Sequence, residues 1–245
     1  MGIMVPWQLD DDPQAPFPPV DTALRDPDGL LAIGGDLSAP RLVNAYRAGI
    51  FPWFNPGEPI LWWSPDPRTV FDTARFRLSR SNRRNLRELS HCQIRIDHDF
   101  ATVMQRCADT PRSGQRGTWI SQPMLDAYTH LHELGHAHCI SVHDGDRLIG
   151  GLYGVASGRM FFGESMFSAH PGGSKLALAA TCHLLATLGF PLLDAQVHNP
   201  HLALMGAQSL PRKDFSQIVA RFSALPGIVG HWSGLPAPTV AGLLA

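Results

Sequence analysis

A run of three strand-like segments followed by a long apolar helix constrains the fold of this chain more than any other feature. Residues 137–143 alternate with the two-residue period of a strand. Asp144-Gly145 is a hairpin signal, and further strand-like runs follow at 148–156 and 160–165. The sequence therefore predicts an antiparallel meander in the second half of the chain.

The helix after the meander spans residues 173–188 and is strongly apolar, and Gly189 marks its end. A further strand is predicted over residues 192–197. A meander, a buried helix and another strand form an α+β order. This order resembles the acyltransferase (GNAT-like) fold, in which three or four strands precede a central helix. We therefore expect a mainly antiparallel sheet with flanking helices, and further helices are predicted at 79–89, 100–107, 123–134 and 214–222.

The first part of the chain differs in composition. Residues 1–66 are rich in Pro and Gly and contain one clear helix, which Ser38 can cap and Gly49 can end. The segments around that helix, including residues 51–54, are interpreted as turns. We expect a small loop-rich N-terminal domain over residues 1–66 and a larger domain over 67–245.

Composition narrows the class of protein. Hydrophobic residues make up 44% of the 245 residues and charged residues 17%, which is typical of a globular chain. No stretch approaches the roughly 18 apolar residues of a membrane span, so no membrane partner is expected. The four cysteines are scattered without CxxC spacing, which favours free thiols in a reducing, cytoplasmic compartment. The net charge of −1 means that any nucleic-acid binding must depend on local charge.

Several long motifs identify a family resemblance. They are GIFPWF at residues 49–54, WWSPDPR at 62–68, FGESMFS at 162–168, LDAQVHN at 193–199, GLLAIGGDL at 29–37 and GTWI at 117–120. These motifs occur in the order found in leucyl/phenylalanyl-tRNA–protein transferases, and the resemblance runs from about Phe17 to Phe215. It implies an aminoacyltransferase that moves Leu or Phe from charged tRNA to proteins that begin with Arg or Lys. It also implies that these proteins are thereby marked for bacterial N-end-rule degradation.

The expected reaction converts an activated ester into an amide, so it runs downhill without ATP, metal or another cofactor. Asp194 and Gln196 lie two apart on the predicted strand and are expected to share a face. The resemblance assigns this pair to catalysis, with Gln196 closest to the chemistry and Asp194 orienting its amide. A side-chain amide is a very poor base, so positioning is favoured for Gln196. The alternative is a buried polar pair that only pins the strand.

Glu164 lies within an otherwise apolar run and therefore needs a partner. The resemblance places it in the donor pocket as a third catalytic residue, near the ammonium or the arginine of the acceptor. The alternative is a surface turn with Glu164 in water. The aminoacyl side chain would be enclosed by apolar residues, and such a pocket is expected to accept Leu, Phe and also Met. By resemblance these are Leu152, Phe161, Gly163 and Met166.

Two tryptophans and an arginine cluster complete the implied site. By resemblance, Trp53 and Trp119 hold the terminal adenosine of the tRNA, because indoles stack on bases. The alternative for a Trp beside a Pro is packing at a domain interface, and Trp62 and Trp63 are assigned to structure on that ground. Arginines recur at helical spacing in the densest basic stretch, where an RNA backbone is expected; those that match the family are Arg80, Arg83 and Arg84.

Three other functions compete with this interpretation. The sequence HELGH at residues 132–136 satisfies the HExxH zincin motif, which suggests a zinc protease. Gly135 indicates a helix end there and strand alternation begins at Ala137, so we interpret the motif as structural and expect no metal. The Gly-rich segment at residues 170–175 raises a coenzyme A-dependent N-acyltransferase as a second alternative. A non-catalytic RNA-binding module would explain the arginines but not the polar groups at 164, 194 and 196.

Overall fold

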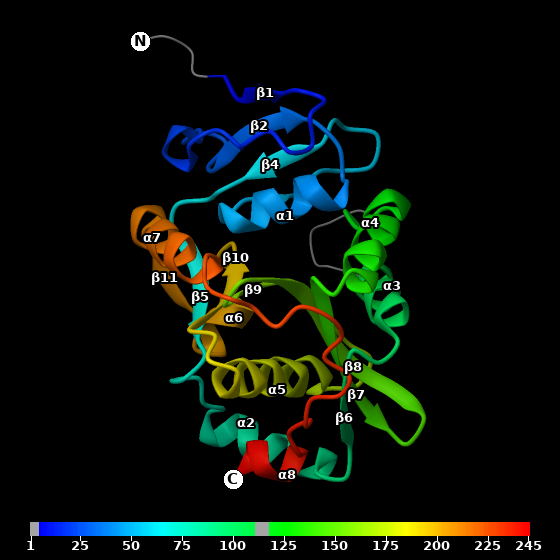
Figure 1. Ribbon diagram of the computed structural model, residues 1–245. Helices are drawn as coiled ribbons and strands as arrows, with labels where there is room; N and C mark the ends of the chain where they lie inside the picture. The colour runs from blue at the N-terminus through cyan, green and yellow to red at the C-terminus, as the bar shows by residue number, and fades with distance from the viewer. Residues whose placement is uncertain (1–4, 111–117) are drawn as a thin grey trace.

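The computed structural model describes residues 5–110 and 118–245 of the chain, and it contains two sheets (Figure 1). The smaller sheet has the strand order β1-β2-β4-β3 and lies at the N-terminal end of the molecule. Its strands are β1 (Trp7–Leu9), β2 (Leu30–Gly34), β3 (Phe51–Pro52) and β4 (Leu61–Trp63). Helix α1 (Ala39–Arg47) follows β2. A short 3-10 turn, η1 (Val20–Thr22), lies between β1 and β2.

The turn predicted at residues 51–54 is wrong in part, because Phe51 and Pro52 pair with Trp63 and Trp62 as strand β3. Proline has no backbone N–H to donate and is tolerated at the edge of a sheet, which is where β3 lies. Proline is therefore compatible with both a turn and an edge strand, and the sequence alone does not distinguish between them at this position.

The larger sheet has the strand order β11-β5-β10-β9-β8-β7-β6. The predicted meander forms its centre, as β7 (Ala137–Asp144), β8 (Arg147–Ser157) and β9 (Met160–Ser168). Neighbouring strands pair antiparallel except β10 with β9, which run parallel. The remaining strands are β5 (Arg68–Asp72), β6 (Gln93–Ile96), β10 (Leu192–Gln196) and β11 (Gln208–Leu210).

Helices cover both faces of the larger sheet. Helix α5 (Gly173–Thr187) packs on β7, β8 and β9 over one face, while α3 (Phe100–Asp109) and α4 (Gln122–Glu133) cover the other. Strand β8 shows the division, because Tyr153 belongs to the core around α3 and α4 whereas its neighbour Leu152 belongs to the core around α5. Because helices cover both faces of the sheet, nearly every residue of β7 and β8 is buried.

Shorter helices close the ends of the fold: α2 (Arg80–Asn85) with the 3-10 turn η2 (Arg87–Leu89), α6 (Pro200–Leu204), α7 (Arg212–Ser223) and α8 (Val240–Leu244).

The α+β class, the separate N-terminal part and the order of meander, central helix and further strand are confirmed. The small sheet ends at Trp63 and the large one begins at Arg68, while the domain boundary between residues 66 and 67 stays a prediction. Among the described residues, no helix combines the length and apolarity needed to cross a bilayer.

The close approach of α5 to β8 generates a prediction for Gly150. A Cβ atom there would lie 2.3 Å from the carbonyl carbon of Gly173, at the start of α5. Gly150→Ala must therefore push the helix away from the sheet, and we expect a loss of about 1–3 kcal/mol in the free energy of unfolding. Denaturant unfolding measures this, with Gly234→Ala as the control because a Cβ there meets nothing within 4 Å. An unchanged midpoint for Gly150→Ala would contradict the packing described.

Candidate active site

A cavity of about 530 Å³ lies between the two sheets, with walls from β3, β9 and β10 and from the loop before α4. Seven of the residues predicted for the site line it, namely Trp53, Trp119, Leu152, Gly163, Glu164, Met166 and Gln196. Residues more than a hundred positions apart in the sequence are thus brought together around one space. The other predicted residues lie elsewhere, and each is described below.

Asp194 lies beneath the cavity in a buried ion pair that sequence analysis did not predict. Its carboxylate accepts two hydrogen bonds from Arg68, from Nε to Oδ1 at 2.8 Å and from Nη2 to Oδ2 at 2.7 Å. Neither side chain is exposed to solvent. The guanidinium also lies over the rings of Phe51 and Phe215, at 4.8 Å and 4.6 Å from their centroids. This bidentate geometry fixes Asp194 firmly, and it joins β5, β10, the small sheet and α7.

Asp194 holds Gln196 through the backbone and not, as expected, through the side-chain amide. Oδ1 of Asp194 accepts the backbone N–H of Gln196 at 2.9 Å. Gln196 has a φ of 62°, in the left-handed region, and the pairing of β10 with β5 shifts register between the two residues. The expected strand spacing therefore fails at Gln196. Non-glycine residues held in this region are strained, and such strain clusters at functional sites.

The side chain of Gln196 contacts Glu164 instead. Its Nε2 donates to Oε1 of Glu164 at 2.8 Å, while Oη of Tyr128 donates to Oε2 at 3.3 Å. The Tyr128 hydroxyl is in turn hydrogen-bonded to the hydroxyl of Tyr46. Glu164 is buried, so the prediction that it needs a partner is confirmed, and the alternative of a surface turn in water is wrong.

The pKa of Glu164 is raised to about 8. Burial is the main cause, since it penalises the charged carboxylate, and the nearby Asp194 carboxylate raises the pKa further. Hydrogen bonds from Tyr46, Tyr128 and Gln196 lower it in part. A strongly shifted carboxyl group that lines a cavity is a strong indicator of a functional site.

The apolar wall of the cavity includes three of the four predicted pocket residues, Leu152, Gly163 and Met166. Phe161 does not line it. Its ring is 1% exposed and lies 6.0 Å from that of Trp232, within the core around α5. The ring of Phe161 occupies the space left by Gly154 on β8, where a Cβ would meet its Cε1 at 2.6 Å. This packing explains the correction to the predicted pocket.

Four tryptophans fall into two groups by their positions in the structure. Trp53 is 36% exposed and Trp119 is nearly buried, and both line the cavity. Trp62 is fully buried and donates its Nε1–H to the carbonyl of Gly34. Trp63 donates to the carbonyl of Trp53 at 2.6 Å and so fixes the backbone that carries the exposed indole. Gly117, the first residue of the GTWI motif, lies outside the described residues.

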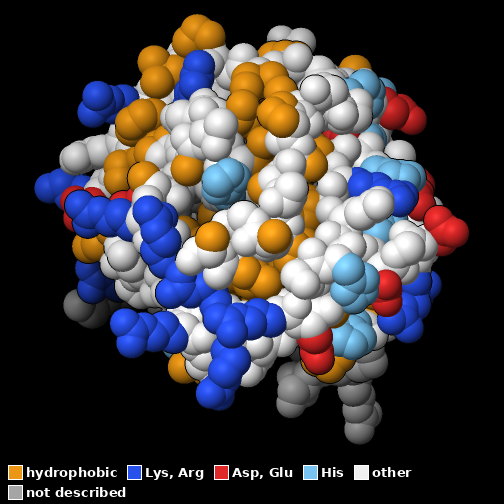
Figure 2. Space-filling model, turned by 90° about the horizontal axis from the view of Figure 1, so that it is seen from below, with side chains coloured by type: hydrophobic (Ala, Val, Ile, Leu, Met, Phe, Trp, Pro, Cys, Tyr) orange, Lys and Arg blue, Asp and Glu red, His pale blue; other side chains and the backbone are white. Residues whose placement is uncertain are grey.

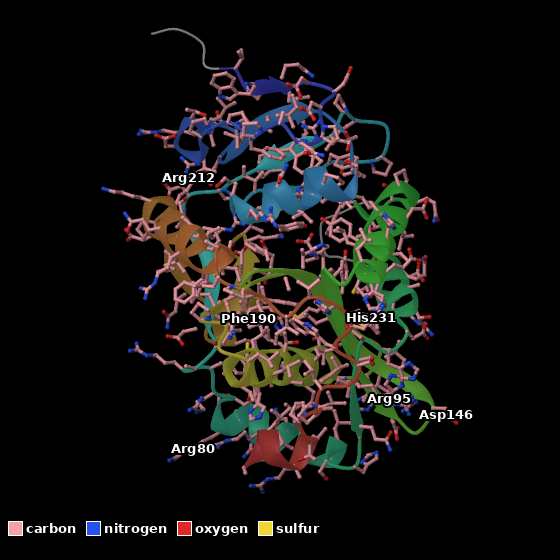
Figure 3. All side chains as sticks on the ribbon, in the orientation of Figure 1. Arg80, Arg95, Asp146, Phe190, Arg212 and His231 are labelled. Atoms are coloured by element: carbon pink, nitrogen blue, oxygen red, sulfur yellow. The ribbon has the colours of Figure 1, made fainter. Side chains whose placement is uncertain are left out.

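The arginine helix is observed as α2 and the adjoining turn η2, at the end of the molecule opposite the small sheet. Figure 2, seen from below, shows Lys and Arg side chains gathered in a band on this face, and Figure 3 shows Arg80 pointing outward from the molecule near α2. A depression there is lined by Arg80, Arg83, Arg84, Arg87 and the end of α8. Nη1 of Arg83 donates to the carbonyl of Ala245 at 2.9 Å, so α8 helps to place the cluster.

The zincin motif lacks the geometry that its metal site requires. Helix α4 ends at Glu133, and Gly135 has a φ of 77°, so His136 does not continue the helix that carries His132. His132 Nδ1 instead contacts the carbonyl of Ala137 at 2.8 Å. Within residues 5–110 and 118–245, two groups could hold a metal, and neither includes His136 or Glu164; they are His91, Cys92 and Asp144, and Asp97, His132 and His231.

Comparison with known proteins decides the family. Residues 70–220 match the profile described as leucyl/phenylalanyl-tRNA protein transferase, and residues 35–66 match the N-terminal domain of the same family. The chain belongs to the leucyl/phenylalanyl-tRNA–protein transferase family. The resemblance inferred from the motifs is therefore confirmed, and the zinc protease and coenzyme A alternatives are not favoured.

Individual relatives agree with the family match. A leucyl/phenylalanyl-tRNA–protein transferase of Xanthomonas axonopodis pv. citri (strain 306) is 61% identical, covering 96% of this chain and 94% of the relative. One of Xylella fastidiosa (strain M23) is 54% identical over 94% of each chain. Among solved structures, the C-terminal domain of a lysylphosphatidylglycerol synthetase from Agrobacterium fabrum is 11% identical, covering 79% of this chain and 61% of that one. Its TM-score of 0.37 is too low to carry an argument.

Sequence reasoning missed three residues of this transferase site. Arg68 ends the WWSPDPR motif, but nothing in the sequence indicates that its partner lies 126 residues away. Tyr46 and Tyr128 lie on helices that the sequence predicts, but the helical pattern gives their hydroxyls no role. A hydroxyl on the buried face of each helix is the signal that could have been noticed, because a buried tyrosine hydroxyl needs a hydrogen-bond partner.

The buried ion pair predicts a large effect for Arg68→Met. This substitution leaves the Asp194 carboxylate buried without its cation, and we expect a loss of about 3–5 kcal/mol in the free energy of unfolding. Denaturant unfolding measures it. Arg75→Met is the matched control, because Arg75 is 83% exposed in its ion pair with Asp72 and should change stability by less than about 1 kcal/mol. Equal effects of the two substitutions would contradict the role given to Arg68.

Proposed function

We propose that this chain transfers Leu or Phe, and also Met, from charged tRNA to the N-terminal Arg or Lys of acceptor proteins. The observation that carries the proposal is one cavity that combines an apolar wall, two tryptophans and the hydrogen-bonded pair Gln196–Glu164. The family supplies the coarser statement, an aminoacyl-tRNA donor and a protein acceptor. A cytoplasmic location and a role in N-end-rule degradation belong to the same proposal.

The chemistry fits the groups present. The nitrogen of a neutral amine attacks the ester carbonyl carbon, a C–N bond forms, and the C–O bond to the tRNA ribose breaks. The amine loses one proton and the ribose oxygen gains one, so the reaction balances without a cofactor. With Nε2 of Gln196 donating to Glu164, its Oε1 is available to accept a hydrogen bond from the attacking amine. Gln196 is then a positioning group of the kind that lowers the barrier by orientation.

Donor recognition divides between the two ends of the aminoacyl-adenosine. The wall of Leu152, Gly163 and Met166 would take the apolar side chain of Leu, Phe or Met, and such pockets discriminate weakly between apolar groups. The indoles of Trp53 and Trp119 would stack on the adenine. Because Trp53 comes from the small sheet and Met166 from β9, donor binding would engage both parts of the chain.

Acceptor recognition would involve Glu164. It is the buried carboxyl group that lines the cavity, and an Arg or Lys at the acceptor N-terminus brings a cation and an amine to the same place. The cation would be attracted to the oxygens of the Glu164 carboxyl group, which can accept its hydrogen bonds. A residue without that cation would gain no such interaction.

The experiment that tests the function is transfer of labelled Leu from charged tRNA to two peptides. One peptide begins with Arg and the other, otherwise identical, begins with Ala. We expect label on the first alone. Label on both would refute the acceptor preference, and label on neither would refute the proposed function.

The arginine cluster predicts a salt-dependent contribution to donor binding. Replacing Arg80, Arg83 and Arg84 with Ala should weaken binding of charged tRNA and reduce the slope of log affinity against log salt by about 2–3, because three phosphate contacts are lost. Transfer from an aminoacyl-adenosine should change little. A filter-binding titration at several salt concentrations measures the slope, with alanine at the surface residues Arg95, Arg147 and Arg221 as the control. Equal loss with both donors would show that the helix is structural.

The position of Gln196 predicts that its substitution lowers the turnover rate without weakening donor binding. Gln196→Ala removes the amide oriented toward the amine, so the turnover rate should fall by roughly one or more orders of magnitude while donor affinity stays near wild type. Asp194→Ala also leaves the Arg68 guanidinium buried without its partner, so it should lower the free energy of unfolding by about 3–5 kcal/mol as well as the rate, and Gln196→Ala is the substitution that isolates the rate effect. Single-turnover transfer and donor titration measure the two quantities, with the exposed Gln208→Ala as the control. A stable Gln196→Ala protein that transfers at the wild-type rate would leave Glu164 as the leading catalytic residue.

A further inference from the structure

A continuous chain of hydrogen-bonded groups runs from the cavity into the core. It begins at Gln196 on β10, continues through Glu164 on β9 and Tyr128 on α4, and ends at Tyr46 on α1. Both tyrosines are fully buried, and the Tyr46 ring also packs 5.2 Å from that of Phe162. Four elements from both parts of the chain thus converge on one carboxyl group.

The two oxygens of Glu164 have different partners. The oxygen that carries the proton therefore decides whether Oε1 can still accept a hydrogen bond from Gln196. Oε1 accepts from Gln196 and Oε2 accepts from Tyr128, and the hydroxyl of Tyr46 also lies close enough to Glu164 to lower its pKa by hydrogen bonding. With the Glu164 pKa at about 8, the carboxyl group holds a proton in most molecules at neutral pH. A proton on Oε1 would turn that oxygen into a donor, and the Gln196 amide would rotate to offer its own oxygen in return. Its NH₂ group would then face the substrate amine, where an acceptor is needed.

A proton on Oε2 avoids this outcome, because a tyrosine hydroxyl can accept as well as donate. When Oε2 donates to Tyr128, the hydrogen of Tyr128 can turn to Tyr46, which is its other partner. The pKa values of both phenols are raised well above the ordinary value, mainly by burial and then by the charge of Glu164, so both keep their hydrogens. Oε1 then remains an acceptor whether or not Glu164 is charged.

The charged and titratable groups around Glu164 are consistent with this account. Tyr46 faces it from α1, Tyr128 from α4, and Asp194 from β10. Tyr153 on β8 lies behind Tyr128, with ring centroids 6.1 Å apart, and Arg68 on β5 is paired with Asp194 on the far side. The Asp194 carboxylate still raises the pKa of Glu164, although its own hydrogen bonds are directed to Arg68.

We propose that Tyr46 and Tyr128 are positioning residues that keep Oε1 of Glu164 a hydrogen-bond acceptor, and so keep Oε1 of Gln196 turned toward the acceptor amine. This inference rests on the proposed function and deepens it. It assigns a role to the hydroxyls alone, so the aromatic rings that fill the core can stay. Tyr→Phe substitutions therefore isolate it.

The test is the pH dependence of single-turnover transfer to an Arg-initiated peptide. In Tyr128→Phe, a protonated Glu164 is free to donate through Oε1, and we expect transfer at pH 7 to fall about tenfold relative to wild type. Above the Glu164 pKa the ionised carboxylate accepts at both oxygens, so the ratio to wild type should return to within about twofold near pH 9. The titration of the peptide amine is common to both proteins and cancels in the ratio. Tyr46→Phe should show the same pattern with a smaller loss.

Two controls separate this role from a structural one. Thr181→Val removes another buried hydroxyl, which donates to Ala177 within α5, and should leave the pH profile unchanged. In a Glu164→Gln background, Tyr128→Phe should add no pH-dependent loss, because the titrating group is gone. A Tyr128→Phe loss that is equal at every pH, or absent at pH 7, would overturn the inference. Absence of transfer by the wild-type chain at every pH would instead count against the proposed function.

Discussion

The ion pair between Arg68 and Asp194 is the interaction on which the arrangement of this structure depends. Two opposite charges without solvent exposure are stable only when their hydrogen bonds are well formed, and the bidentate contact meets that condition for Nε and Nη2 of Arg68, while Nη1 has no hydrogen-bond partner among the described residues. The same guanidinium lies over Phe51 of the small sheet and Phe215 of α7. Asp194 then fixes the backbone of Gln196 in a left-handed turn. Assembly of the fold and the geometry of the cavity thus share one contact.

Much of the larger sheet follows from local patterns. The segment 137–188 has clear strand periods, a hairpin signal and a long apolar helix, and it folds as predicted. The short strands β2, β4, β5 and β6 were not predicted, because three to five residues are too few to show a period; β10 is equally short and was predicted only from its place after the long helix. Strand β3 was interpreted as a turn, since Pro52 satisfies an edge strand and a turn equally well.

Only part of the candidate site was predicted, because local sequence patterns do not show contacts between distant residues. Residues named from motifs converge on the cavity because the family resemblance already contains the tertiary information. Partners outside the motifs were missed, as contacts such as Tyr128 with Glu164 join helices and strands that are distant in sequence. The relation of Asp194 to Gln196 was wrong in detail, because strand spacing cannot reveal a register shift or a left-handed residue. Phe161 was misplaced because Gly154 opens space for it on the core side.

The location of Arg68 in the chain has a consequence for how such proteins vary. One matched segment ends at residue 66 and the other begins at residue 70, so Arg68 belongs to neither. Yet its contacts reach Phe51 in the first segment and Asp194 in the second. Exchange of one segment between relatives would therefore keep these contacts only where the residues that meet Arg68 are matched. A chimera would need to inherit the linker together with both of its contact surfaces, and the three would be expected to diverge as a single unit.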